Sequence, residues 1–175
     1  MNYYTIQVRT KYEEPYIKRF KARYPDIPVS LYFPQRRIII RQQGKHIPTN
    51  APVFPGYIFV EPLAGEDICL HKRAFRGTEG FFRFLRSNQD VCPLSDRDME
   101  TALRFTKIFG PVAGISKVYF DQNSRIVVVE GPLAGLEGNI IKVDKRKRRA
   151  KVKLDVYDDS FAIDLAFETL EPSEL

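Results

Sequence analysis

The sequence predicts an α+β protein in two units: a mixed sheet with helices packed on it, followed by a small β-barrel. Three observations carry this prediction. Strand-like and helix-like patterns alternate as far as Phe109. A stretch rich in glycine, "GPVAGISK" (residues 110–117), then reads as a linker. From Val118 onward helical periodicity disappears, and short apolar runs are separated by glycines, which is typical of a barrel.

In the first unit, segments rich in β-formers predict strands at 3–8, 29–33, 38–41, 53–61 and 80–85. Amphipathic segments predict helices at 13–24, 67–75 and 95–109. Pro15 suits the first turn of the first helix, and Pro25 ends that helix. Ser95, with Asp98 three residues later, resembles a capping box for the last helix. Gln43-Gly44 predicts a hairpin turn after residues 38–41.

Strict alternation in the last strand of this unit would place Phe82 and Phe84 on one face, and Phe81 and Arg83 on the other.

In the second unit, apolar runs predict strands at 126–129, 140–143, 152–156 and 161–167. Gly131, Gly135 and Gly138 punctuate them, because glycine allows the sharp turns that join barrel strands. The expected organisation is therefore a first domain at 1–110, a linker at 111–120 and a barrel at 121–172.

The composition indicates an anionic partner and argues against catalysis. The net charge is +6, and residues 1–115 carry 18 Lys and Arg against 11 Asp and Glu, so the first unit holds the excess, as nucleic-acid-binding proteins often do. Cys69 and Cys92 form no C-x-x-C pair, and His46 and His71 complete no metal cluster. The sequence shows no P-loop or nucleophile motif either, so we expect no enzyme activity, no cofactor and no metal.

Neither a signal peptide nor a membrane-spanning run is visible in the sequence. The first ten residues, "MNYYTIQVRT", lack a long apolar core, and no apolar run approaches the roughly 18 residues that span a bilayer. We therefore expect a cytoplasmic protein without membrane contact.

Several motifs together resemble the NusG family. "VVVEGPLAGLEGNIIKVD" (residues 127–144) is similar to the KOW motif, with Gly131-Pro132, Ala134-Gly135 and Gly138 leading into a strand. "VFPGYIFVE" (53–61) looks like the "FFPGY" strand of the NusG N-terminal (NGN) domain. "YYTIQV" (3–8) and "PLSDRDMETALRF" (93–105) resemble its first strand and its last helix. In this order the motifs cover nearly the whole chain.

The resemblance implies an RNP-like NGN domain and an SH3-like KOW barrel in a transcription elongation factor. In that family the NGN domain binds the clamp helices of RNA polymerase and suppresses pausing, while the barrel recruits Rho or a small-subunit ribosomal protein. It also implies contact with the non-template DNA strand or the nascent RNA. We expect a monomer.

The resemblance implies polymerase-binding residues on two strands. Tyr57 and Phe59 share one face of their strand, opposite Ile58 and Val60. With helices covering only one side of the sheet, the aromatic face should stay partly open, although these rings could equally be core. The residues implied for polymerase binding are Phe54, Tyr57, Phe59, Phe82 and Phe84.

Two basic sets are candidate nucleic-acid contacts, or else solvated surface charges. The first set, Arg9, Lys11, Arg73 and Arg76, matches positions near nucleic acid in specialised NusG paralogues such as RfaH. The second set is the run "KRKRR" at the predicted tip of a barrel hairpin: Lys145, Arg146, Lys147, Arg148 and Arg149.

In the barrel, Val156, Tyr157 and Phe161 correspond to the NusG loop that contacts Rho or the ribosome. Asp158-Asp159 replaces a Gly-Arg pair there, which leaves Rho binding in doubt.

Three functions stay open: a specialised antiterminator of the RfaH or LoaP kind acting on selected operons, a general NusG factor, and a ribosome-associated KOW protein. The basic first unit, the altered loop and the unusual segment "YFPQRRIIIRQQGKHI" (32–47) favour the first. A barrel that refolds as a helical hairpin is disfavoured by its β-branched residues and glycines.

Overall fold

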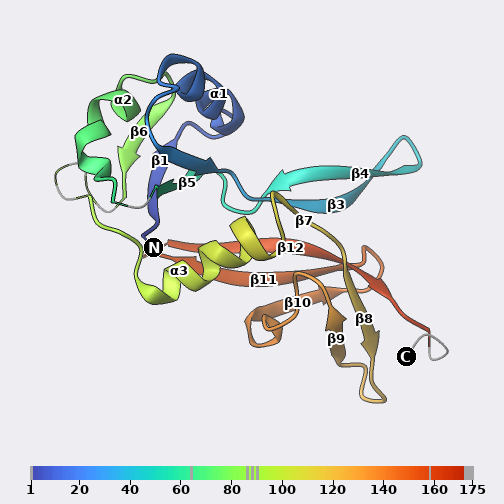
Figure 1. The fold of residues 1–175 in the computed structure, drawn as a ribbon. Coiled ribbons are helices and arrows are strands. Elements are labelled where there is room, and N and C mark those ends of the chain that lie inside the picture. Colours follow the sequence, from blue (N-terminus) through green and yellow to red (C-terminus); the bar gives the residue numbers. More distant parts are fainter. Residues whose placement is uncertain are drawn as a thin grey trace.

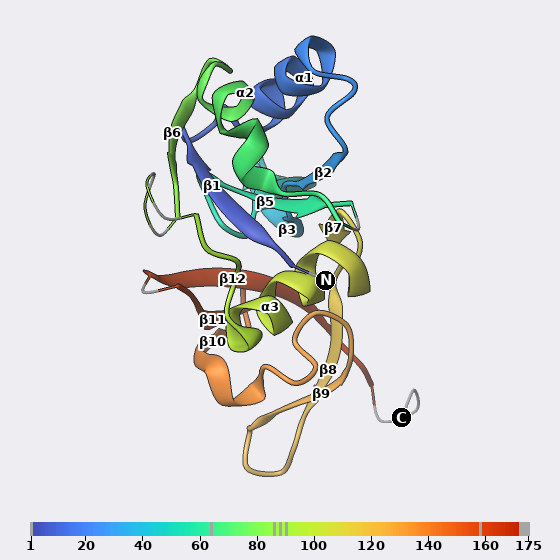
Figure 2. The same cartoon turned by 60° about the vertical axis from the view of Figure 1, so that its left-hand side comes forward.

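The structure is a computed structural model that describes residues 2–63, 65–85, 87, 89, 91–157 and 159–171. It has an N-terminal unit and a C-terminal barrel, joined through a helix that lies between them (Figures 1 and 2). The elements of the N-terminal unit are β1 (Tyr4–Val8), α1 (Glu13–Arg23), β2 (Val29–Tyr32), β3 (Gln35–Gln42), β4 (Lys45–Pro52), β5 (Tyr57–Pro62), η1 (Ile68–His71), α2 (Lys72–Arg76), β6 (Phe81–Phe84), α3 (Asp96–Leu103) and η2 (Arg104–Ile108). Then follow β7 (Val112–Ala113), β8 (Ser116–Phe120), β9 (Ile126–Glu130), η3 (Glu137–Asn139), β10 (Ile140–Asp144), β11 (Arg149–Val156) and β12 (Asp159–Thr169).

The N-terminal unit is built on a four-stranded sheet in the order β2-β5-β1-β6, whose recorded pairs are all antiparallel. The helices α1 and α2 cover one face of this sheet (Figure 2). Phe20 of α1 stacks on Phe75 of α2 with ring centroids 4.5 Å apart, and the Tyr16 hydroxyl donates to the Phe75 carbonyl at 2.9 Å. Ile58 and Val60 face this layer, so it forms a complete small core.

The opposite face of the sheet is covered by α3, η2 and the barrel. As predicted, Ser95 caps α3: its hydroxyl accepts from the Asp98 amide at 3.3 Å and donates to the Asp98 carboxylate at 2.7 Å. The helix continues as a π-helical turn, η2, which brings Phe105 edge-on to Phe54 at 6.0 Å. One apolar cluster therefore runs from the N-terminal sheet through the helix into the barrel.

An ion pair between a buried carboxylate and a half-exposed ammonium fixes η2 to the N-terminal sheet. The carboxylate of Glu61 on β5 accepts from the Lys107 ammonium at 2.8 Å and from the Tyr32 hydroxyl at 2.6 Å. Burial raises the pKa of Glu61, but the hydrogen bonds from Lys107 and Tyr32 outweigh it and hold this pKa below its ordinary value. The same bonds raise the pKa of Lys107.

The strands β3 and β4 form a long hairpin that projects from the body of the molecule (Figure 1). The predicted turn at Gln43-Gly44 is present, with both residues at positive φ. At the base of the hairpin, β7 pairs with β3 in parallel, which fixes that end of the hairpin.

The barrel is a five-stranded sheet in the order β10-β11-β12-β8-β9. Val152, Leu154, Leu165 and Phe167 alternate into its interior. Gly131 has φ +99°, and a Cβ there would lie 2.7 Å from the Ser116 Cα. This glycine is therefore required for the close approach of β8 to the turn that follows β9.

Two expectations about local structure need correction. Residues 111–120, expected as a linker, contain β7 and β8, and β8 pairs with both β9 and β12. "SKVYF" is a five-residue strand with alternating burial, but the glycines before it led to the prediction of a linker. In β6, a register shift against β1 places Phe81 and Phe84 together, 5.2 Å apart, and leaves Phe82 68% exposed. A bulge of this kind cannot be read from alternation.

Within the described part of the chain, no helix is both long and apolar enough to span a bilayer.

Replacing Ser95 with alanine should destabilise the protein by about 1 kcal/mol, because the first turn of α3 loses its side-chain cap. Denaturant unfolding measures this, with Ser95→Thr as the control that keeps an acceptor oxygen. An unchanged midpoint for Ser95→Ala would contradict the capping role.

Replacing Lys107 with methionine should destabilise the protein at pH 7 by about 1 to 2 kcal/mol, allowing for the solvent that screens this half-exposed side chain. Glu61 stabilises the fold above its ordinary pKa of 4.5, and this contribution is lost as pH falls through its lower folded pKa. The difference between the two proteins should therefore shrink below pH 4.5 in denaturant unfolding at several pH values.

Arg19→Met, which removes a more exposed pair with Glu79, is the matched control and should cost at most about 0.5 kcal/mol. A Lys107→Met deficit that is the same at acid and neutral pH would contradict the role given to Glu61.

Candidate functional site

The aromatic face of β5, formed by Tyr57 and Phe59 of the strand together with Phe54 of the bend before it, lies at the contact between the N-terminal unit and the barrel. Phe161 of β12 packs edge-on against Phe54 at 5.2 Å and against Tyr57 at 5.1 Å. Tyr57 is 5% exposed, and Phe54 and Phe59 are fully buried. The expectation of a partly open face is therefore wrong for this arrangement, because the barrel and η2 occupy the side that no helix of the first layer covers.

A hydrogen bond at the edge of this contact joins the same two elements. The Tyr57 hydroxyl donates to the carboxylate of Asp159. Burial and this carboxylate raise the pKa of Tyr57 above its ordinary value, so the phenol stays protonated and remains a donor.

Arginines hold the barrel against β3 and η2. Arg36 donates to the carbonyl of Asp164 at 2.7 Å, and Arg149 donates to the carbonyl of Ile39. Arg104 of η2 donates to the carbonyl of Ala134, beside Gly135. Burial lowers the pKa of Arg36; Asp164 opposes this effect and Arg149 adds to it. These donors satisfy main-chain carbonyls across the interface.

The residues predicted for KOW partner binding fall in or beside this interface. Val156 is buried in the barrel core, and Tyr157 is half-buried at the turn with φ 55°. Phe161 contacts the aromatic face of β5, as described above. The structure thus brings together the aromatic face of β5, which the resemblance assigned to polymerase, and barrel residues that it assigned to Rho or the ribosome. Each of the two surfaces covers the other.

The remaining aromatic candidates do not share that face. Phe84 packs in the helix-side core against Phe75 at 5.6 Å. Phe82 points to solvent beside the register shift in β6. Of the aromatic residues predicted to bind polymerase, Phe82 alone is exposed.

The first basic set lies on the helix side of the N-terminal unit. Arg9 and Lys11 are exposed after β1, with the Arg9 guanidinium 5.1 Å from the Tyr12 ring centroid. Arg73 and Arg76 are exposed on α2. The structure does not bring this set together with the basic run of the barrel, which lies at the other end of the molecule (Figure 1).

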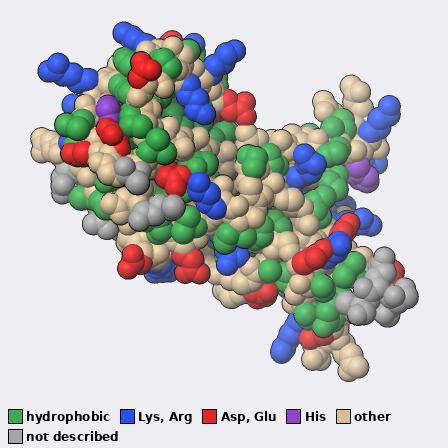
Figure 3. Space-filling view, viewed as in Figure 1, with side chains coloured by type: hydrophobic (Ala, Val, Ile, Leu, Met, Phe, Trp, Pro, Cys, Tyr) green, Lys and Arg blue, Asp and Glu red, His purple; other side chains and the backbone are tan. Residues whose placement is uncertain are grey.

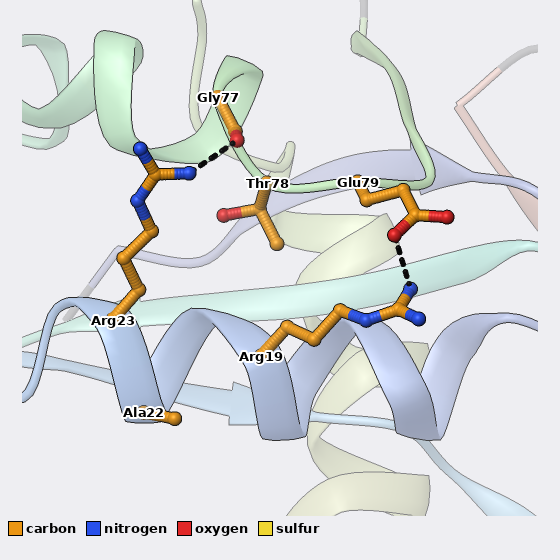
Figure 4. A pocket seen from close by; sticks show the side chains of 6 residues that line it. All are labelled: Arg19, Ala22, Arg23, Gly77, Thr78 and Glu79. Atoms are coloured by element: carbon orange, nitrogen blue, oxygen red, sulfur yellow. Dashed lines mark hydrogen bonds and ion pairs between the residues drawn. The ribbon is translucent and has the colours of Figure 1, made fainter.

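A shallow hollow of about 440 Å³ lies between α1 and the turn after α2 (Figure 4). Two arginines of α1 face it and are already engaged: Arg23 donates to the Gly77 carbonyl at 3.3 Å, and Arg19 pairs with Glu79 at 3.1 Å. These two contacts join α1 to the turn. Both arginines that line the hollow therefore already have a partner within the protein.

The basic run occupies the tip of the β10–β11 hairpin, as predicted, with Asp144 opposite Arg149. The Lys145 ammonium lies 4.0 Å from the Phe120 ring centroid. The Asp144 carboxylate accepts from the Lys147 amide at 2.9 Å, and this bond lowers the pKa of Asp144. Four residues of the run are exposed, whereas Arg149 turns into the interface.

Sequence reasoning missed the cross-domain partners Arg36, Arg104, Asp159 and Asp164. No local pattern marks them, because each acts on a residue far away in the chain. It also left unassigned the exposed charges of the β3–β4 hairpin, although a stretch from 35 to 52 with no acidic residue was a visible signal.

No group of three or more His, Cys, Asp or Glu residues that could hold a metal ion occurs among the residues that the structure describes.

Comparison with known proteins gives one consistent family. The family model described as "Transcription termination factor nusG" matches residues 1–103. Similar proteins include the "Transcription termination/antitermination protein NusG" of Bacillus subtilis, 23% identical with 97% of each chain covered. Those of Thermus thermophilus and Helicobacter pylori are each 24% identical, covering 86% and 98% of this chain and 84% and 98% of theirs.

A solved structure titled "Domain interaction in Thermotoga maritima NusG" aligns with a TM-score of 0.45 and 19% identity, over 94% of this chain and 93% of that one. The family model spans more than half of the 175 residues. This match shows that the chain belongs to the NusG family.

Proposed function

We propose that this protein is a cytoplasmic transcription elongation factor that binds RNA polymerase and promotes antitermination on selected operons. The aromatic face of β5 is the proposed docking surface for the polymerase clamp helices. The observation that carries the proposal, in a protein of this family, is a pair of large rings on one side of β5, Tyr57 and Phe59, with the Phe54 ring of the preceding bend edge-on to Phe59. The protein acts by binding, without a catalytic step.

Docking has a structural condition. The face is buried against Phe161, η2 and the barrel, so polymerase reaches it only after the barrel moves away. Binding of polymerase then competes with an intramolecular contact, and its apparent affinity falls by the fraction of molecules that are open.

The covered face favours the specialised function over the general one. A factor that acts on nearly every polymerase has no use for a docking surface that is covered at rest, whereas a selective factor gains discrimination if a recruiting DNA or RNA element opens it. The partner of the freed barrel is then a small-subunit ribosomal protein. Asp159 lies where Rho-binding relatives carry a different charge, so Rho is the less favoured partner.

Weakening the contact between the domains should strengthen polymerase binding. Phe161→Ala removes two edge-on ring contacts, which shifts the equilibrium towards the open form by about 2 kcal/mol, or more than tenfold. Retention of the variant by purified RNA polymerase should rise accordingly.

Tyr119→Ala is the matched control, an aromatic truncation in the barrel on β8 rather than at the interface. In the Phe161→Ala background, adding Tyr57→Ala and Phe59→Ala should abolish the gain, with the fold checked by circular dichroism. Retention that survives the last two substitutions would show that the docking face is wrong.

Chromosome-wide mapping of the protein together with polymerase distinguishes the two transcription roles. The proposal predicts occupancy on a few operons, and Phe161→Ala should broaden it. Occupancy on nearly all transcribed genes by the unmodified protein would favour the general factor, and a failure to co-purify with polymerase would favour the ribosome-associated alternative.

A further inference from the structure

The β3–β4 hairpin is a basic arm, and its exposed charges are not part of the proposed docking face. Residues 35–52 hold four Lys and Arg and no acidic residue. Arg37, Arg41 and Lys45 are exposed, as is His46. Figure 3 shows Lys and Arg side chains along this projecting part of the surface.

The strand pairing places the charged residues of the hairpin on two different faces. Arg37 lies opposite Asn50 and Arg41 opposite His46, so these residues share one face. Arg36 lies on the other face and is bonded to the barrel. The arm is therefore held at its base by Arg36, while the face with Arg37, Arg41 and His46 is open to solvent.

The barrel places a second basic element beside this arm. Residues 142–151, the β10–β11 hairpin turn with its flanks, contain seven Lys and Arg and one Asp. The link is direct, because Arg149 at the end of the turn donates to the carbonyl of Ile39 in the middle of β3. Since a strand rises about 3.3 Å per residue, Arg41 lies about 7 Å along β3 from that contact.

A small hollow of about 130 Å³ lies in the basic turn. Four cations line it: Lys142, Lys147, Arg149 and Lys151. Its acidic residues are already engaged, since Asp144 accepts from the Lys147 amide and Asp164 pairs with Arg149 and Lys151 at 3.9 and 3.7 Å. The excess of positive charge around the hollow suits one phosphate group.

We propose that the arm and the turn form one surface that binds the phosphodiester backbone of a nucleic-acid duplex, and that this surface is complete only while the barrel is closed. The arm belongs to the N-terminal unit and the turn to the barrel, so opening separates them. We take the partner to be a duplex because residues 35–52 contain no Phe, Tyr or Trp, the large rings on which unpaired bases stack most strongly. A two-stranded ribbon also fits the major groove of B-form DNA.

The consequence is a linkage between duplex binding and closure. A duplex that contacts both elements stabilises the closed form and opposes exposure of the aromatic face of β5. Variants that open the molecule should therefore change two affinities in opposite directions, weakening duplex binding while strengthening polymerase binding.

The test is fluorescence anisotropy of the full chain, without polymerase, on duplex DNA, duplex RNA and the matching single strands across a salt series. Two paired variants probe the two elements: Arg41→Gln with Lys45→Gln on the arm, and Arg146→Gln with Lys147→Gln on the turn. Lys18→Gln with Lys21→Gln on α1 removes the same charge from an exposed surface elsewhere.

Each of the first two pairs should weaken duplex binding about tenfold and reduce the slope of log K against log salt by about 1 to 2, as expected for one or two lost phosphate contacts. The control pair should change affinity less than about twofold. Phe161→Ala should lower duplex affinity although it removes no charge. The comparison of duplex DNA with duplex RNA shows which backbone is preferred.

Three outcomes would overturn the proposal. The control pair could weaken binding as much as the other two, which would mean attraction by net charge alone. Only one of the two elements could matter, or Phe161→Ala could leave duplex affinity unchanged, and either would mean that no composite surface exists. Tighter binding of single strands than of duplexes would exclude a duplex as the partner. Because polymerase is absent, none of these outcomes depends on the proposed docking function.

Discussion

The contact between Phe161 and the rings of Phe54 and Tyr57 is the interaction on which the arrangement of this molecule depends. It closes the open face of the N-terminal sheet with a strand of the barrel, and it places Asp159 within reach of the Tyr57 hydroxyl. Buried edge-on aromatic pairs are each worth about 0.5–1.5 kcal/mol beyond their area, which is enough to bias two domains towards one orientation without locking them. The contact is thus suited to being replaced by another partner.

Closure has two consequences that oppose each other. It covers the face that we propose for polymerase, and it brings the basic arm of the N-terminal unit against the basic turn of the barrel through Arg149 and Ile39. Bringing like charges together is unfavourable, and Asp164 offsets part of that repulsion. An anionic ligand would offset more of it. A single equilibrium between closed and open forms can then respond to nucleic acid and to polymerase with opposite signs.

The sequence predicted what local chemistry determines and missed what distant residues determine. The Ser95 cap and the Gln43-Gly44 turn follow from short-range hydrogen bonding and φ preferences, and both are present. The separation of Tyr57 from Ile58 follows from strand alternation. Asp159, the hydrogen-bond partner of Tyr57, however, lies 102 residues away, and no sequence pattern near either residue predicts this contact. The bulge beside Phe82 depends on the register against β1 and was equally invisible to alternation.

Closure in solution is the central claim, and a distance distribution between the two domains tests it most directly. Spin labels at Lys18 on α1 and at Asn123 in the β8–β9 turn, with Cys69 and Cys92 replaced by serine, report on the two units in pulsed electron paramagnetic resonance. The structure predicts one narrow distribution for the free protein, which broadens in Phe161→Ala. A broad distribution in the protein with Phe161 intact would mean that the domains move independently, and would contradict the covered face and the composite surface together.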